Sequence, residues 1–411
     1  MTTASTAWAQ VLARVVDEAH LTSGDQLSAL VDGAVRPLGL GADVLVADLA
    51  QRVLTPVGTT AVAPLNVVGT LAGHAYQMGE ILAGTDHSDG VVLWTPIAGG
   101  GDRTGVLRVA LGEGVVDDLE LRQRLWTLAG LVNYIVTTKL AYSDRLRRLR
   151  SAVPLSAASE LLWQLLPPRT FATDRVVVSA LLEPCARVAG DAYDYNAEDQ
   201  VVDLAVFDAA GHDINACLTT ALAITGIRNG RRAGETDLVA LAERADELII
   251  AQHGPVQFAT AVLTRLDTEA GILEYLIAGH PAPLLIRGGQ VVKELPAPAR
   301  APLSVRVPRD EVPVVMREQL EPGDQVLMYT DGITEARDAD GEFFGEKRLV
   351  EFAEHAAAAQ LSAPETLRRL LEAVLDHQGG KLQDDASLLL VDWDRGAHAR
   401  MFPGLAHQAR S

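Results

Sequence analysis

The sequence predicts an α+β protein, because strand-rich stretches are interrupted by helical patterns that come in clusters. From residue 176 onward, short apolar runs follow one another closely, with helical patterns between them. The first 115 residues combine helical patterns with a few short strands. We therefore expect two α+β units, the second built from antiparallel sheets that helices cover.

The first unit, residues 1–115, is expected to begin with helices and to end with a strand pair. The expected elements are helices at 7–19, 24–35 and 73–82, strands at 43–47, 91–96 and 106–110, and a turn at 97–102. This order of elements resembles that of a GAF sensor domain. GAF domains are defined by shape more than by motif, so the resemblance assigns no ligand residue.

Residues 116–170 are expected to form a helical linker. Apolar residues recur there at helical spacing, from Leu119 through Leu128 to Ile135. Residues 144–150 are basic and are best explained as a solvated helix end. A second short helical pattern at 161–166 stops at two prolines. The apolar face indicates either core or the seam of a homodimer formed through residues 116–166.

The second unit is expected over residues 171–395, followed by a tail at 396–411. Its strands are expected at 176–182, 201–207, 259–266, 273–278, 284–287, 291–295, 312–317, 325–329 and 387–391. Its helices are expected at 213–228, 237–252, 346–358 and 363–376.

The composition is that of an ordinary globular protein: 48% of the 411 residues are hydrophobic and 22% are charged. The formal net charge is −19, from 54 acidic and 35 basic side chains. Such a charge argues against nucleic acid or an anionic membrane as a partner, because both would be repelled. A divalent cation or a basic protein surface suits it better.

The cysteines and the chain's apolar runs indicate a soluble, cytoplasmic protein. There are two cysteines, Cys185 and Cys217, and neither belongs to a spaced pair or lies beside a histidine cluster. This pattern indicates a reducing compartment and no structural zinc. The first ten residues lack the features of a signal peptide, and no apolar window is long enough to cross a bilayer.

Four aspartates stand where apolar runs end or are interrupted at tight turns: Asp191, Asp208, Asp331 and Asp384. Carboxylates brought together at such positions would repel one another unless a cation lay between them. Taken singly, each is more easily explained as a structural residue: Asp191 and Asp331 lie beside glycine and could be turn residues, as Asp213 could be a helix cap. Taken together, they predict a metal site, because aspartate oxygens suit hard divalent cations.

Other chemistries find no support in the sequence. Neither cysteine has an activating neighbour, and no nucleophile elbow occurs. The glycine run 99–101 is not followed by the Lys-Ser/Thr pair of a nucleotide-binding loop. The sequence therefore gives no support to nucleophilic Ser or Cys catalysis or to a P-loop.

Five segments in the second half carry a resemblance to a known family. They are Val188-Ala189-Gly190-Asp191-Ala192-Tyr193-Asp194, Asp208-Ala209-Ala210-Gly211-His212, Ile277-Ala278-Gly279-His280-Pro281, Thr330-Asp331-Gly332-Ile333-Thr334-Glu335-Ala336 and Asp384-Asp385-Ala386-Ser387. Their order resembles the SpoIIE-like, RsbU-like branch of the PPM (type 2C) metal-dependent protein phosphatases. The resemblance covers about residues 161–393.

The resemblance implies an αββα sandwich with a centre of two Mn²⁺ or Mg²⁺ ions between the sheets, which hydrolyses phosphoserine or phosphothreonine on a protein. Its metal ligands would be Asp191, Asp208, the backbone carbonyl of Ala209, Asp331 and Asp384. Asp208 would bridge both ions. Asp385 replaces Asp384 if the last motif is shifted by one residue.

Two departures from the family pattern bear on the site. Ala189 stands where the family commonly has glycine, which requires only a backbone without positive φ there. Asp213 follows His212 where the family commonly has glycine; its carboxylate could recruit a further metal or cap a helix. The family uses a histidine near the bridging aspartate as general acid. His212 is the candidate for that role although its spacing is offset, and His280 is expected to be structural.

We therefore expect a protein serine/threonine phosphatase regulated by an N-terminal sensor. The resemblance suggests a phosphorylated regulatory protein as its substrate, in particular an anti-sigma-factor antagonist of the STAS type. The alternative is a catalytically weak signalling scaffold that keeps the fold and binds a partner protein. Another binuclear hydrolase, such as a phosphodiesterase, would be expected to use histidine ligands, which these motifs scarcely offer.

Overall fold

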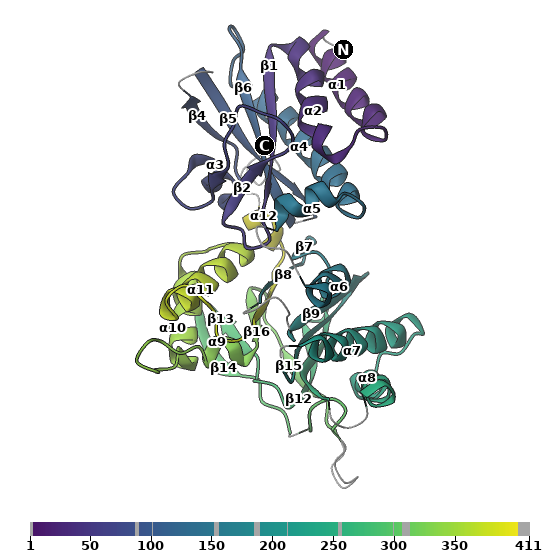
Figure 1. The fold of residues 1–411 in the computed structure, drawn as a ribbon. Coiled ribbons are helices and arrows are strands. Elements are labelled where there is room, and N and C mark those ends of the chain that lie inside the picture. Colours follow the sequence, from purple (N-terminus) through teal and green to yellow (C-terminus); the bar gives the residue numbers. More distant parts are fainter. Residues whose placement is uncertain are drawn as a thin grey trace. The chain divides into compact units, whose positions relative to one another are not determined.

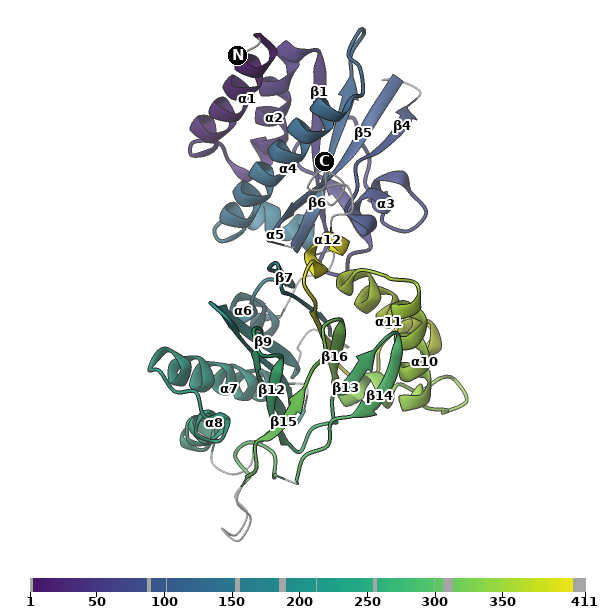
Figure 2. The same ribbon diagram turned by 180° about the vertical axis from the view of Figure 1, so that it is seen from behind.

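The computed structural model describes residues 3–86, 90–100, 102–151, 156–184, 190–211, 213–253, 257–298, 300–305 and 313–401. The chain divides into two compact units, Met1–Pro154 with Ala399–Ser411, and Leu155–His398. Figures 1 and 2 show both units from opposite sides. Within the described residues, no helix is both long and apolar enough to span a bilayer.

The N-terminal unit is built on one antiparallel sheet of six strands in the order β3-β2-β1-β6-β5-β4. The strands are β1 (Leu40–Ala47), β2 (Val53–Pro56), β3 (Leu65–Asn66), β4 (Leu82–Asp86), β5 (Gly90–Gly99) and β6 (Asp102–Leu111). Its helices are α1 (Thr3–Ala19), α2 (Leu27–Val35), α3 (Leu71–Met78), α4 (Leu119–Leu140) and α5 (Asp144–Arg150), with short 3₁₀ turns η1 (Gly24–Gln26) and η2 (Arg36–Leu38).

Alternation along β1 gives this sheet two packed faces. Ala42 and Val44 belong to a core that α1, α2 and α4 complete. Leu45 packs on the opposite face, in a smaller core that includes Tyr76 of α3. The elements occur in the order that suggested a GAF domain, and the GAF assignment itself stays a prediction.

The helix expected over residues 73–82 is shorter than expected. α3 ends at Met78 because Gly79 adopts a left-handed backbone, with φ of 71°, and its N–H bonds to the carbonyl of Ala75. Residues 82–86 form the edge strand β4 instead of the last helical turn.

The helical residues 116–170 are divided between the two units. α4 packs on β5 and β6, and its leucines Leu125 and Leu128 are fully buried in the N-terminal core. α6 (Ala157–Leu165) packs on α7 in the C-terminal unit. Most of the apolar stripe is therefore explained by packing within one unit.

The C-terminal unit is a sandwich of two antiparallel sheets with helices on the outside, as the αββα prediction required. One sheet has the order β15-β12-β11-β10-β9 and the other β14-β13-β16-β17-β8-β7. The first comprises β9 (Ala192–Glu198), β10 (Val201–Ala209), β11 (Ala259–Asp267), β12 (Ile272–Ala278) and β15 (Met316–Gln319). The second comprises β7 (Thr170–Ala172), β8 (Val176–Glu183), β13 (Leu284–Arg287), β14 (Gln290–Glu294), β16 (Asp324–Tyr329) and β17 (Ala386–Trp393).

A single core fills the space between these sheets. Val206 of β10 and Leu389 of β17, both fully buried, belong to it. α7 (Ile214–Arg232) and α8 (Leu238–His253) cover the first sheet, and α10 (Gly345–Ala358) and α11 (Ala363–His377) cover the second. Figure 2 shows these helix pairs on opposite sides of the sandwich.

Two further differences from the expected elements concern strands. β9 was not predicted, because its polar residues hide the apolar alternation. The strand expected at 312–317 begins only at Met316, and Val312 lies outside the described residues. After β17 the chain forms the short helix α12 (Ala397–Met401). The Met401 carbonyl accepts a hydrogen bond of 2.7 Å from Arg103 Nη2, and both residues belong to the N-terminal unit.

Candidate metal and catalytic site

The predicted aspartates lie at the ends of four strands, β9 and β10 of one sheet and β16 and β17 of the other. Asp191 directly precedes β9, and Asp208 is the penultimate residue of β10, its neighbour in the sheet. Asp331 opens the one-turn helix α9 (Asp331–Thr334) after β16, and Asp384 and Asp385 directly precede β17. Since β16 pairs with β17, these residues come to one end of the second sheet.

The carboxyl groups are close enough to perturb one another. Burial, then the charges of Asp208 and Asp385, raises the pKa of Asp191 well above its usual value. Burial, then the charges of Asp331 and Asp384, raises the pKa of Asp208 to about 7. Five carboxylates separated by up to 194 residues in the sequence therefore share one small region.

Asp331 belongs to the same cluster. Burial raises the pKa of its carboxyl, and the charges of Glu335 and Asp384 raise it further. Asp384 is exposed while Asp385 is buried, so the two neighbours have different surroundings.

Asp191 and Asp385 are held by groups from the opposite half of the site. Thr330 Oγ1 donates a hydrogen bond to Asp191 Oδ2 at 2.7 Å, and the Ser387 N–H donates to Thr330 Oγ1 at 2.9 Å. The Gly190 N–H donates to Asp385 Oδ2 at 2.6 Å. These contacts join the two sheets at the cluster.

Two glycines allow the chain segments to approach so closely. A Cβ at Gly190 would lie 2.8 Å from the carbonyl oxygens of both Ala209 and Gly211. A Cβ at Gly332 would lie 1.8 Å from the carbonyl oxygen of Asp385, a distance that no side chain can tolerate. The Gly-Asp and Asp-Gly pairs of the motifs thus serve backbone packing around the carboxylates.

His280 is structural, as expected from the sequence. Its Nε2 donates to the Tyr329 carbonyl of β16 at 3.0 Å, and its Nδ1 accepts from Thr260 Oγ1 of β11 at 2.6 Å. Burial lowers its pKa to about 4, so the ring is neutral near pH 7. It ties the two sheets together two residues before Asp331.

The remaining candidates are Asp213, Ala209 and His212. Asp213 caps α7, accepting hydrogen bonds from the N–H groups of Asn215 and Ala216 at 2.9 and 3.1 Å. These contacts are those of a helix cap and not of a further metal ligand. Ala209 ends β10. His212 lies outside the described residues, and so does Ala189.

The donor set fits a hard divalent cation by its chemistry, since it consists of carboxylate oxygens whose mutual repulsion a cation would relieve. Among the described side chains, no group of three or more His, Cys, Asp or Glu residues is arranged to hold a metal ion. Asp191 Oδ2 and Asp385 Oδ2 are instead occupied by hydrogen bonds.

Sequence reasoning missed the residues that support the carboxylates. Thr330, which is fully buried, connects Asp191 to β17, and Thr220 of α7 donates to the Gly190 carbonyl. Thr330 could have been noticed as a polar residue between an apolar run and Asp331. Thr220 gives no such signal, because it lies in an ordinary helical pattern.

Comparison with known proteins places this site in a family context. Residues 198–394 match the family model described as stage II sporulation protein E (SpoIIE). The chain is 25% identical over 243 residues to the protein IcfG of Synechocystis sp., a match that covers 52% of this chain and 37% of IcfG. It is 21% identical over 268 residues to the phosphoserine phosphatase RsbU of Bacillus subtilis, covering 64% and 77%.

The chain thus spans little more than a third of IcfG. Among solved structures, the SiaA-PP2C domain of Pseudomonas aeruginosa is similar, with 24% identity and a TM-score of 0.47, covering 53% of this chain and 86% of that one.

Proposed function

The C-terminal unit belongs to the SpoIIE branch of the PPM protein phosphatases, and from this premise we propose that the chain is a metal-dependent protein serine/threonine phosphatase. The observation that carries the proposal is the convergence of Asp191, Asp208, Asp331, Asp384 and Asp385 at one end of the sandwich. Five carboxylates that repel one another lower the stability of the fold, so their convergence indicates a functional role.

We assign the metal-binding role to Asp191, Asp208, Asp331 and Asp384, with the carbonyl of Ala209. Bound Mn²⁺ or Mg²⁺ would supply a water of lowered pKa and positive charge for the phosphoryl oxygens. Asp208 interacts with each of the other four carboxylates of the cluster, which supports it as the ligand that bridges both ions. Asp384 is exposed and close enough to Asp331 to raise its pKa, which supports Asp384 as the last ligand. Asp385 instead accepts a hydrogen bond from the Gly190 N–H.

The chain's own residues keep the site in place. Thr330 and Gly190 hold Asp191 and Asp385 by hydrogen bonds, and His280 holds the end of β16. Such fixed positions favour in-line attack on a phosphorus, which needs chiefly orientation and charge neutralisation.

The test is hydrolysis of p-nitrophenyl phosphate and of a phosphoserine peptide by the full chain with Mn²⁺. Asp208→Ala and Asp331→Ala are each expected to lower kcat/KM roughly 100-fold or more, because each removes a metal ligand. Asp376→Ala, an exposed residue near the end of α11, is the matched control and should keep full activity. Activity that survives both ligand substitutions would refute the metal site.

For the substrate we propose a phosphorylated regulatory protein of the STAS anti-sigma-factor antagonist type, in the cytoplasm. The relative named phosphoserine phosphatase supports the chemistry of the bond, and the resemblance supports the class of protein. Loss of phosphate from a phosphorylated STAS protein, followed by mass spectrometry, tests it. A chain that binds this protein without removing its phosphate would be the scaffold of the alternative hypothesis.

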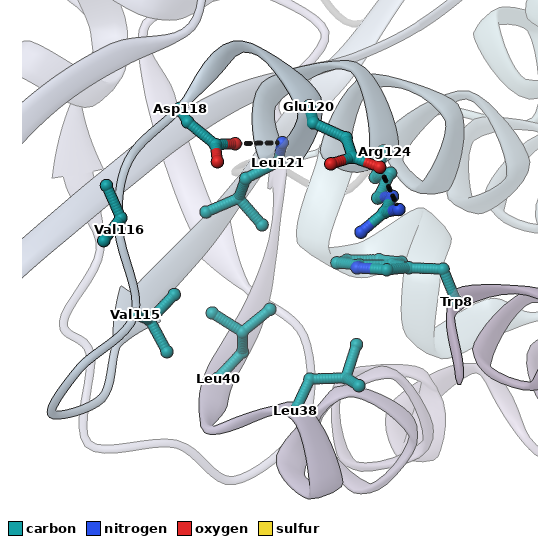
Figure 3. A pocket seen from close by; sticks show the side chains of 9 residues that line it. All are labelled: Trp8, Leu38, Leu40, Val115, Val116, Asp118, Glu120, Leu121 and Arg124. Atoms are coloured by element: carbon teal, nitrogen blue, oxygen red, sulfur yellow. Dashed lines mark hydrogen bonds and ion pairs between the residues drawn. The ribbon is translucent and has the colours of Figure 1, made fainter. Parts of the chain in front are cut away.

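We also propose that the N-terminal unit regulates the phosphatase as a GAF-like sensor. A hollow of about 660 Å³ supports this, since its lining includes Trp94 and the ion pair between Arg108 and Asp43, 3.0 Å apart. A smaller hollow of about 210 Å³ lies between α1 and the start of α4 (Figure 3). There the Arg124 guanidinium lies over the ring of Trp8, 5.9 Å from its centre.

A homodimer through the helices of residues 116–166 also stays a proposal. Its surface would have to use exposed residues of α4 such as Leu119 and Tyr134, since Leu125 and Leu128 are buried within the unit. Sedimentation of the full chain measures the mass, and a monomer at working concentration would contradict the dimer.

A further inference from the structure

A loop beside the carboxylate cluster carries an arginine that the site itself does not use. The loop covers residues 335–344, between α9 and α10, and an antiparallel bridge pairs Arg337 with Phe343 across it. The Asp338 carboxylate accepts from the N–H groups of Asp340 and Glu342, both at 2.9 Å. At the base, Phe344 is buried and packs edge-on against His377. The loop is therefore a defined structure.

The loop is joined to the cluster at two points. It begins where α9, which Asp331 opens, comes to its end. Gln383 Nε2 also donates a hydrogen bond to the Arg337 carbonyl at 3.0 Å, and Gln383 directly precedes Asp384. A protein segment whose phosphate reaches the carboxylates would therefore have Arg337 within reach of its flanking residues, since two or three extended residues span roughly 7–10 Å.

The side chain of Arg337 is free to bind a partner. Its guanidinium lies over the ring of Phe343, 4.5 Å from the centre, and Phe343 itself is 44% exposed. Arg337 forms no ion pair with any residue in the described part of the chain. Arg348, in contrast, pairs with Glu342 at 2.8 Å and donates to the Phe343 carbonyl. A guanidinium stacked on a ring keeps its donor edge available for a carboxylate.

We propose that Arg337 and Phe343 form a docking point for the residues that flank the phosphorylated side chain of the protein substrate, and that Arg337 selects an acidic residue among them. This inference rests on the proposed phosphatase function. Arg337 is an exposed cation on a loop whose exposed residues Glu335 and Asp340 are acidic, in a chain with a net charge of −19. These acidic groups repel an acidic flanking residue, whereas the Arg337 guanidinium attracts it, so its position relative to Arg337 decides whether it binds.

The experiment compares two phosphoserine peptides that differ only in their flanking residues, glutamate in one and lysine in the other. The measured quantity is the ratio of kcat/KM for the two peptides, which cancels any general change in activity. The wild-type chain with Mn²⁺ is expected to prefer the glutamate peptide. Arg337→Glu should change the ratio roughly tenfold toward the lysine peptide. Phe343→Leu should weaken the preference, because the guanidinium loses its support.

Lys347→Glu is the matched control, since it makes the same charge change at an 88% exposed side chain of α10. Its ratio should stay at the wild-type value. A wild-type chain without preference, or an Arg337→Glu ratio equal to wild type, would overturn the docking point while leaving the phosphatase proposal intact. Failure of the wild-type chain to hydrolyse both peptides and p-nitrophenyl phosphate would overturn the phosphatase proposal, and this inference with it.

Discussion

At the residue scale, His280 shows how a motif residue can serve structure and not chemistry. Its ring is buried between Thr260 and the Tyr329 carbonyl, and burial lowers its pKa to about 4. The unfolded chain has an ordinary histidine pKa of about 6.5. Between these values the unfolded state binds the extra proton, so stability is lost as the pH falls from about 6.5 toward 4.

This shift predicts how His280→Gln alters the pH dependence of unfolding. The wild-type chain should lose about 2–3 kcal/mol of stability between pH 7.5 and pH 4.5 that the glutamine variant, which does not titrate, does not lose. Urea unfolding of both proteins at the two pH values measures the difference. Carboxylates common to both proteins cancel in this comparison. Equal pH dependence in the two proteins would show that His280 is not held neutral by the fold.

The ionisation of Asp208 changes stability with pH in the opposite direction to that of His280. Its pKa of about 7 in the folded protein lies above that of an unfolded aspartate, so its proton stabilises the fold at low pH and is lost as the pH rises toward 7. A metal must displace this proton. The affinity for Mn²⁺ is therefore expected to rise about tenfold between pH 6 and pH 8.

Calorimetric titration of the full chain with Mn²⁺ at both pH values measures that change. Asp376→Ala should reproduce the wild-type dependence, because its carboxylate is exposed and outside the cluster. An affinity that does not vary with pH would contradict the raised pKa of Asp208.

At the element scale, Asp194 explains why β9 was hard to predict. Its sequence, Ala192–Glu198, alternates poorly because Asp194, a fully buried residue that contacts α7, is polar. Arg228 and Arg231 of α7 both donate to this carboxylate at 2.6 Å, and Arg228 also donates to the Leu165 carbonyl at the end of α6. One buried carboxylate therefore joins a strand to two helices.

Asp194→Asn is expected to lower the free energy of unfolding by about 3–5 kcal/mol, because two arginines lose their counter-charge inside the protein. Glu274→Gln is the control: it removes an ion pair with Arg317, whose side chain is 75% exposed, and should cost about 1 kcal/mol or less. Denaturant unfolding compares the two. Equal, small effects would mean that water reaches the Asp194 cluster.

The elements that sequence reasoning found are those whose pattern is local. β13 and α11 were predicted closely because apolar spacing and their flanking turns define them. The short strands β2, β3 and β7 carry no such pattern and exist through their partners in the sheet. The carboxylates could be grouped from their motifs, whereas the roles of Thr330 and Thr220 depend on contacts across 139 and 30 residues.

At the scale of the whole molecule, the two units have separate cores. Calorimetry of the full chain is therefore expected to show two transitions. Val44→Ala should lower the melting temperature of one and Val206→Ala that of the other, since these fully buried residues belong to different cores.

Removal of residues 399–411 should lower the same transition as Val44→Ala. Met401 is 1% exposed, and its carbonyl accepts from the buried Arg103 of the N-terminal unit. A truncation that shifts only the Val206-sensitive transition would contradict this assignment.

The position of β17 also bears on how the protein is made. This strand lies between β16 and β8 in its sheet, yet more than 200 residues separate its partner β8 (Val176–Glu183) from β17 (Ala386–Trp393). The six strands of the N-terminal sheet are all translated by residue 111, so that unit can begin to fold early on the ribosome. The folding of the C-terminal sandwich cannot be completed until its central strand β17 has been synthesised, and until then the edges of β8 and β16 stay unpaired. Chaperone demand during synthesis should therefore fall on the C-terminal half of the nascent chain.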